Sequence, residues 1–271
     1  MNQRIWRQRR RIFLVAVLAL SAAFLLLPGK AHLAVVLLAV LQIPIVFAAV
    51  VFRPQLRFWL TKCAIAGFTF SVLNLISDAD FMPLLMLICL GLAVLLVPSQ
   101  LWVLDVLRMP GISINRARRR IGWDREALWG QLFPTATEDH WDPAVAGINP
   151  TPSPDIFTYM YANAAYHGNE HVPIRVFDVA RAAEFKLRDL SLPDVEDGGP
   201  VSVLGHQLDE MDGDTVLTLT EGTWRQGIWT AFNSWLDDYL EDHMDRITAL
   251  LHNEFDWSVK GQDLRRFIDE E

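Results

Sequence analysis

The sequence predicts a membrane α-helical protein with four transmembrane helices in two hairpins (residues 12–104), followed by an α-rich α+β cytoplasmic domain (121–271). Two observations lead to this fold class. Apolar runs follow one another from residue 12 to residue 104, and 52% of the whole chain is hydrophobic. Charge also divides the chain: residues 1–120 hold 14 Lys and Arg against three Asp, whereas residues 121–271 hold 10 against 29 Asp and Glu. A basic apolar part is therefore expected to precede an acidic polar part.

The apolar part contains four runs, and each has roughly the length of a membrane span. A hydrocarbon core of about 30 Å needs about 20 helical residues, so three runs fit and the first is slightly short. A cleaved signal peptide is the alternative for the first run, but that run is long for a signal core and a second run follows at once. The four runs are 12–27, 31–52, 58–76 and 81–104.

The placement of basic residues predicts the orientation. Clusters of arginine lie in a basic N-terminus (1–11), between the second and third runs, and in a linker (105–120). Because basic residues stay on the cytoplasmic side, both termini are expected in the cytoplasm, with the spans in a bacterial inner membrane. No charged residue is expected at mid-membrane depth, so the spans are interpreted as an anchor, although a pore formed by several copies stays open.

The linker carries a basic run that predicts contact with lipid. Arg116, Arg118, Arg119 and Arg120 are expected to bind anionic lipid head groups, each contributing about 1 kcal/mol near the surface. Nucleic acid is not expected as a partner, because the acidic domain that follows would repel phosphates.

The acidic domain is expected to mix helices and strands around one core. Periodicity predicts strands at 172–179, 200–204 and 215–220, with a turn at 212–214 joining the last two into a hairpin. Helices are expected over the remaining apolar stripes. Those helices are 121–133, 155–166, 180–190, 223–252 and a short final piece at 262–268.

The sequence His167-Gly168-Asn169-Glu170-His171 matches the H-x-x-E-H pattern of one class of zinc hydrolases. In such sites His167 and His171 would bind zinc and Glu170 would serve as the general base. That chemistry needs a continuous helix, whereas Gly168 and Asn169 favour a surface turn. A surface turn is the preferred interpretation, and no cofactor is predicted.

Two further patterns could carry chemistry. Arg246 and His252 have an R-x5-H spacing, which resembles, in those two residues, the arginine–histidine pair of helical HEPN ribonucleases. The alternative is that Arg246 pairs with Asp242, one helical turn away. The carboxylates of Asp209, Glu210, Asp212 and Asp214 could chelate a cation, but they do not follow the EF-hand pattern, so a solvated turn is preferred.

With no strong catalytic motif, the sequence favours a non-enzymatic role, and whether the protein is an enzyme stays open. The leading hypothesis is an accessory or scaffold subunit of a membrane complex, whose acidic domain docks a protein partner or another copy. One alternative is a membrane-bound enzyme, a metal-dependent hydrolase or nuclease, with its site in the acidic domain. The other is a membrane-perturbing effector with a cytoplasmic sensor domain.

Overall fold

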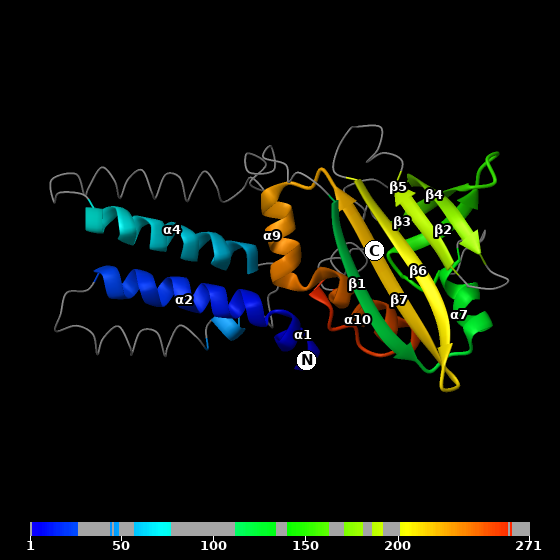
Figure 1. Cartoon of the computed structure of the whole chain (residues 1–271), viewed down its shortest axis with the longest axis horizontal. Helices are drawn as coiled ribbons and strands as arrows, with labels where there is room; N and C mark the ends of the chain where they lie inside the picture. The colour runs from blue at the N-terminus through cyan, green and yellow to red at the C-terminus, as the bar shows by residue number, and fades with distance from the viewer. Residues whose placement is uncertain are drawn as a thin grey trace. The chain divides into compact units, whose positions relative to one another are not determined.

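The computed structural model describes residues 2–26, 44, 46–48, 57–76, 112–133, 140–162, 171–180, 186–191, 201–259 and 261. The chain divides into two compact units, each of which is described by itself (Figure 1). Unit 1 comprises Met1–Leu104 together with Asn233–Asp237, and unit 2 comprises Asp105–Phe232 together with Asp238–Glu271.

The prediction of four transmembrane helices is wrong. Among the residues that the structure describes, no helix is both long and apolar enough to cross a membrane. The first and third runs form α2 (Arg9–Leu26) and α4 (Arg57–Ile76), and both helices begin with basic residues. After Arg11 in α2 and Lys62 in α4, 15 and 14 residues remain in the helices. At a rise of about 1.5 Å per residue these stretches span about 22 Å, against a hydrocarbon core of about 30 Å.

The predicted location and role depended on those spans. The inner-membrane location, the cytoplasmic termini, the membrane-subunit function and its two membrane-bound alternatives are therefore corrected together with the fold class. The second run lies outside the described residues except for 44 and 46–48, and the fourth run lies wholly outside them.

Unit 1 contains α1 (Asn2–Arg7), α2 and α4 in its described part. α2 and α4 pack against each other along their lengths. Val15, Val46 and Ala64 form a small buried cluster, against which Ile12, Leu18 and Leu60 pack.

Unit 2 is built on a seven-stranded antiparallel sheet with the order β1-β7-β6-β5-β4-β3-β2. The chain therefore starts at one edge and crosses to the other. It then returns strand by strand until β7 pairs with β1. The strands are β1 (Ile112–Ile121), β2 (Val145–Pro150), β3 (Ile156–Tyr161), β4 (His171–Ala180), β5 (Lys186–Ser191), β6 (Val201–Met211) and β7 (Asp214–Trp224).

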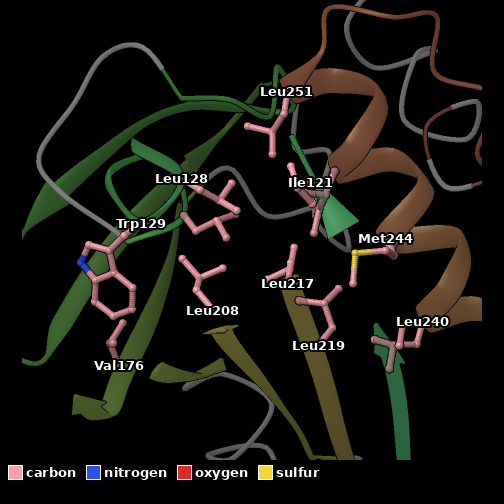
Figure 2. Close-up of a cluster of buried hydrophobic side chains, with 13 residues drawn as sticks. Ile121, Leu128, Trp129, Val176, Leu208, Leu217, Leu219, Leu240, Met244 and Leu251 are labelled. Carbon is pink, nitrogen blue, oxygen red and sulfur yellow. The ribbon is translucent and has the colours of Figure 1, made fainter. Parts of the chain in front are cut away.

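Two helices cover one face of this sheet, which we call the inner face. α7 (Arg125–Leu132) starts at Asp124, whose carboxylate accepts hydrogen bonds from two backbone N–H groups of the first turn. α10 (Tyr239–Leu251) directs Met244 and its other apolar side chains toward β1 and β7 (Figure 2). The core is formed by Ala117, Ile121, Leu128, Trp129, Leu132, Val176, Leu208, Leu217, Leu219, Leu240, Met244, Ile247 and Leu251.

Several predicted elements of the acidic part are confirmed. α7 lies within the predicted helix 121–133, β4 covers the predicted strand 172–179, and β6 and β7 form the predicted hairpin. Asp212 and Gly213 at its turn have φ of 56° and 83°, as two-residue hairpin turns require.

Other predicted elements are wrong, and unit 2 is not α-rich. β3 lies within the predicted helix 155–166, and β5 overlaps the predicted helix 180–190. The whole basic run 116–120 of the predicted linker lies in β1. The predicted long helix 223–252 is divided into the end of β7, α9 (Ile228–Asp237) and α10. Asp238 separates these helices in a left-handed conformation, with φ of 53°. The predicted final helix lies outside the described residues.

Candidate anion-binding surface

The edge strand β1 carries a row of exposed side chains on the outer face of the sheet. Successive side chains of a strand point to opposite faces. Ala117 and Ile121 point into the core, so the even-numbered residues lie on the outer face, and all of them are exposed. Side chains on one face are about 6.7 Å apart along the strand. We call this row the cationic strip, and it consists of Ile112, Ile114, Arg116, Arg118 and Arg120.

One end of the cationic strip is apolar. Ile112 and Ile114 are 69% and 71% exposed, among the most exposed large apolar side chains in the described residues. In the register of β1 and β7, Ile112 is opposite Trp224, which is half-buried, and Ile114 is opposite Gly222. An exposed apolar patch beside charged residues is a common mark of an interaction site.

The arginines in the middle of the strip are less neutralised than Arg120. Arg120 lies 3.0 Å from Asp212 and 3.5 Å from Asp214, in exposed ion pairs that contribute little. Arg118 lies 3.6 Å from the sulfur of Met211. Arg116 makes no hydrogen bond or ion pair within the part of the chain that the structure describes. Positive charge is therefore concentrated next to the two isoleucines.

Arg119 lies on the opposite face from the other three arginines. Its guanidinium is 2.6 Å from Asp245 and 3.4 Å from Glu241, both on α10, and its side chain is half-buried. Of the four residues predicted to bind lipid head groups, the structure thus brings three together on the outer face. The fourth, Arg119, links β1 to α10 through its ion pairs.

The residues of the H-x-x-E-H pattern are only partly described. His171 is exposed at the start of β4, opposite Met160 of β3. His167 and Glu170 lie outside the described residues. Within the described ranges, no group of three His, Cys, Asp or Glu side chains is placed to hold a metal ion. A zinc site at this position stays a prediction.

Arg246 lies in a buried ion-pair network. Its guanidinium binds the carboxylates of Asp142 and, at 2.7 Å, Asp256, and its side chain is 2% exposed. Asp242, the partner expected from the helical spacing, instead accepts a hydrogen bond from the backbone N–H of Val259. His252 is exposed, with Nδ1 2.8 Å from the carbonyl oxygen of Thr248. Arg246 thus joins α10 to the segment that follows it and to one 104 residues earlier in the chain, and nothing in the sequence singled out Asp142 or Asp256.

The predicted acidic turn is the tip of the β6–β7 hairpin. Asp209 accepts a hydrogen bond from Gln207, and Asp212 and Asp214 are the partners of Arg120. These carboxylates are therefore engaged with neighbouring side chains of the chain itself.

Comparisons with known proteins do not identify this chain. No family model matches it, and no curated protein matches it. Matching solved structures include XoxI from Bacillus cereus, with 13% identity over 58% of this chain and 97% of that chain, at a TM-score of 0.34. A putative uncharacterized protein from Bacillus thuringiensis has 11% identity over 58% and 98%, with a TM-score of 0.35. Ara h 8.0201 has 9% identity over 57% and 99%, with a TM-score of 0.34. These scores are too low to support an argument about fold or function.

Proposed function

We propose that unit 2 binds anionic phospholipid surfaces peripherally, through the cationic strip on β1. One observation carries the proposal: exposed isoleucines and exposed arginines occupy a single face of one strand. Guanidinium groups bind phosphate oxygens through paired N–H donors. Transfer of isoleucine side chains out of water is favourable. A lipid surface offers anionic head groups and an apolar layer within a few ångströms of each other.

The estimated energies support binding that is measurable and salt-sensitive. Each arginine near an anionic surface contributes about 1 kcal/mol. An isoleucine transferred fully out of water contributes about 1.5–3 kcal/mol, and partial insertion contributes less. Such a surface would bind lipid reversibly. Added salt would weaken the binding, because salt screens the attraction between the arginines and the anionic head groups.

The experiment compares the full chain with variants in sedimentation with lipid vesicles. The vesicles contain phosphatidylcholine alone or with about 30% phosphatidylglycerol, to supply the anionic surface. We expect binding to the anionic vesicles, and much weaker binding by the variant Arg116→Gln/Arg118→Gln. The variant Ile112→Ser/Ile114→Ser should also bind more weakly, because it removes the apolar contribution at equal charge.

A matched control removes the same charge elsewhere in unit 2. Arg125 is at the start of α7, and Arg175 is on β4, about 19 Å from β1 at about 4.8 Å per strand. The variant Arg125→Gln/Arg175→Gln should bind like the parent. Equal binding by the parent and the strip variant would contradict the proposal. Binding to an acidic polypeptide or to RNA, without binding to vesicles, would contradict the lipid assignment and favour another polyanion.

A protein partner, or a second copy bound through the acidic residues of 121–271, is a separate prediction. The same vesicle experiment does not depend on it, because each variant is compared with its parent at equal protein concentration.

A further inference from the structure

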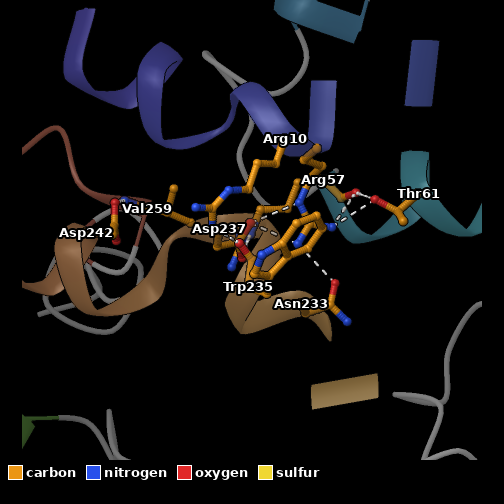
Figure 3. Close-up of polar contacts among 9 residues, drawn as sticks. Arg10, Arg57, Thr61, Asn233, Trp235, Asp237, Asp242 and Val259 are labelled. Atoms are coloured by element: carbon orange, nitrogen blue, oxygen red, sulfur yellow. Dashed lines mark hydrogen bonds and ion pairs between the residues drawn. The ribbon is translucent and has the colours of Figure 1, made fainter. Parts of the chain in front are cut away.

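Unit 1 presents two exposed tryptophans, each with an arginine stacked on its ring. The guanidinium carbon of Arg9 lies 4.2 Å from the ring centroid of Trp6, and that of Arg10 lies 5.1 Å from Trp235. Trp6 is 62% exposed and Trp235 is 55% exposed. Two consecutive arginines at the start of α2 are thus each stacked on one indole ring (Figure 3 shows Arg10 with Trp235).

Backbone contacts hold both arginines in place. Nη1 of Arg9 donates a hydrogen bond to the carbonyl oxygen of Trp6, at 2.5 Å. Nη1 of Arg10 donates to the carbonyl oxygen of Trp235, at 2.8 Å. Because each guanidinium is fixed at two points, by a ring and by a carbonyl, its charge is placed before any ligand arrives, which lowers the entropic cost of binding.

The same side of α2 continues as an exposed apolar stripe. At about 100° per residue, the exposed residues Phe13, Val17 and Phe24 lie on the side of Arg9 and Arg10. Phe13, one turn further on, is 70% exposed. The opposite side of α2 carries Val15, which is buried in the core of unit 1. The order along the exposed side is therefore indole and guanidinium first, then apolar side chains.

Charge in unit 1 also favours an anionic partner. The described residues of this unit hold seven Lys and Arg and a single acid, Asp237. Both oxygens of that carboxylate are occupied in a buried site, by Arg11 and Arg57.

We propose that the Trp6–Arg9 and Arg10–Trp235 pairs form a second contact with an anionic lipid surface. The inference takes its ligand class from the proposed function, but it rests on different residues in a different unit. Indole rings favour the boundary between lipid head groups and acyl chains, because the ring is apolar and its N–H is polar. Arginine binds the head-group phosphates at the same level, and Phe13 enters the apolar layer next to them. A peripheral contact of this kind requires no spanning helix.

The test uses quenching of tryptophan fluorescence in the full chain by anionic vesicles with bromine atoms near the head groups. Bromine quenches only tryptophans that reach that depth. The variant Trp6→Phe/Trp235→Phe should lose most of the quenching, and its affinity should fall about five-fold or more. The control Trp123→Phe/Trp257→Phe removes two half-buried tryptophans of unit 2 and should keep the quenching of the parent.

Two further arms separate the possible outcomes. Inorganic phosphate alone should leave the fluorescence unchanged, because the proposal requires a lipid surface and not a free anion. In the Arg116→Gln/Arg118→Gln background, quenching that depends on Trp6 and Trp235 should persist at higher lipid concentration. Unchanged quenching in Trp6→Phe/Trp235→Phe would overturn this inference, and so would an equal effect of phosphate. If only Arg116→Gln/Arg118→Gln lost binding, the contact by unit 2 would be supported and the contact by unit 1 would be contradicted.

Discussion

At the scale of single residues, β1 shows that a shift of one position along a strand places an arginine on the other face of the sheet and changes its role. Arg118 and Arg119 are neighbours in sequence, yet Arg118 is exposed on the outer face and Arg119 is paired with α10 on the inner face. A run of arginines hides this difference, because their chemistry is the same and only the strand alternation separates them.

Arg119 and Arg118 are expected to respond differently to the same substitution. Arg119→Gln removes the ion pairs to Asp245 and Glu241, and we expect the free energy of unfolding to fall by about 1–2 kcal/mol, because Asp245 is largely buried. Arg118→Gln should change it by less than about 0.5 kcal/mol. Urea denaturation of both variants provides the measurement. An equal effect of the two substitutions would contradict the assignment of faces.

His206 is the buried titratable residue with the clearest consequence for stability. It lies on the inner face of β6, opposite Leu219 of β7, and burial lowers its pKa to about 4. The unfolded chain binds this proton below about pH 6.5, whereas the folded chain does not until about pH 4. Stability is therefore lost as the pH falls from about 6.5 to about 4, by about 3 kcal/mol from this group.

The variant His206→Leu should lose that part of the pH dependence. Denaturation at about pH 7 and about pH 4.5 would give a smaller drop for the variant than for the parent, by about 2–3 kcal/mol. A drop in His206→Leu as large as in the parent would show that the histidine is not buried as a neutral side chain.

At the scale of elements, the sequence predicted the hairpin, β4 and α7, and failed where two periods fit the same residues. In β3, Phe157, Met160 and Tyr161 can be placed on one side of a helix. In a strand, Phe157, Tyr159 and Tyr161 share a face, which is the arrangement observed. Aromatic and β-branched side chains favour the strand, but cross-strand partners decide, and these are 7 to 19 residues away in sequence.

The break between α9 and α10 had no readable signal. Left-handed residues at helix ends are usually glycine or asparagine, whereas this position holds Asp238. The apolar stripe continues across the break, so the periodicity alone predicted one helix. The basic run of the linker predicted the arginines of the cationic strip, but not the strip itself. Its arginines could be chosen from composition, but their separation into three outer residues and one inner residue required the register of β1 with β7.

At the scale of the whole molecule, the apolar runs led to a wrong prediction of transmembrane helices. An average hydropathy over a run does not show which charged residues stand at its start. Arg11 lies directly before the first run and is fully buried in unit 1. It donates hydrogen bonds to Asp237, Asn233 and Thr61. Burial lowers the pKa of Arg11 from its ordinary value, and the charge of Asp237 acts against that shift. The basic N-terminus therefore has a structural role that its position before an apolar run did not suggest.

Asp237 is expected to stabilise unit 1 through its ion pairs with two buried arginines. It pairs with Arg11 at 2.8 Å and with Arg57 at 3.1 Å, and it follows them in the sequence by 226 and 180 residues. Asp237→Asn removes the negative charge that two buried guanidinium groups contact, which should cost about 3–5 kcal/mol. Limited proteolysis should then cut unit 1 faster than in the control Asp238→Asn. Equal cleavage rates would contradict this role.

The central claim, that the cationic strip binds anionic lipid, is tested most directly by one ratio of affinities. The full chain and Arg116→Gln/Arg118→Gln are titrated with vesicles containing about 30% phosphatidylglycerol at low salt. Two arginines at about 1 kcal/mol each predict that the variant binds about 30-fold more weakly. A ratio within about two-fold, or an equal loss in Arg125→Gln/Arg175→Gln, would contradict the claim, because binding would then not depend on where the charges lie.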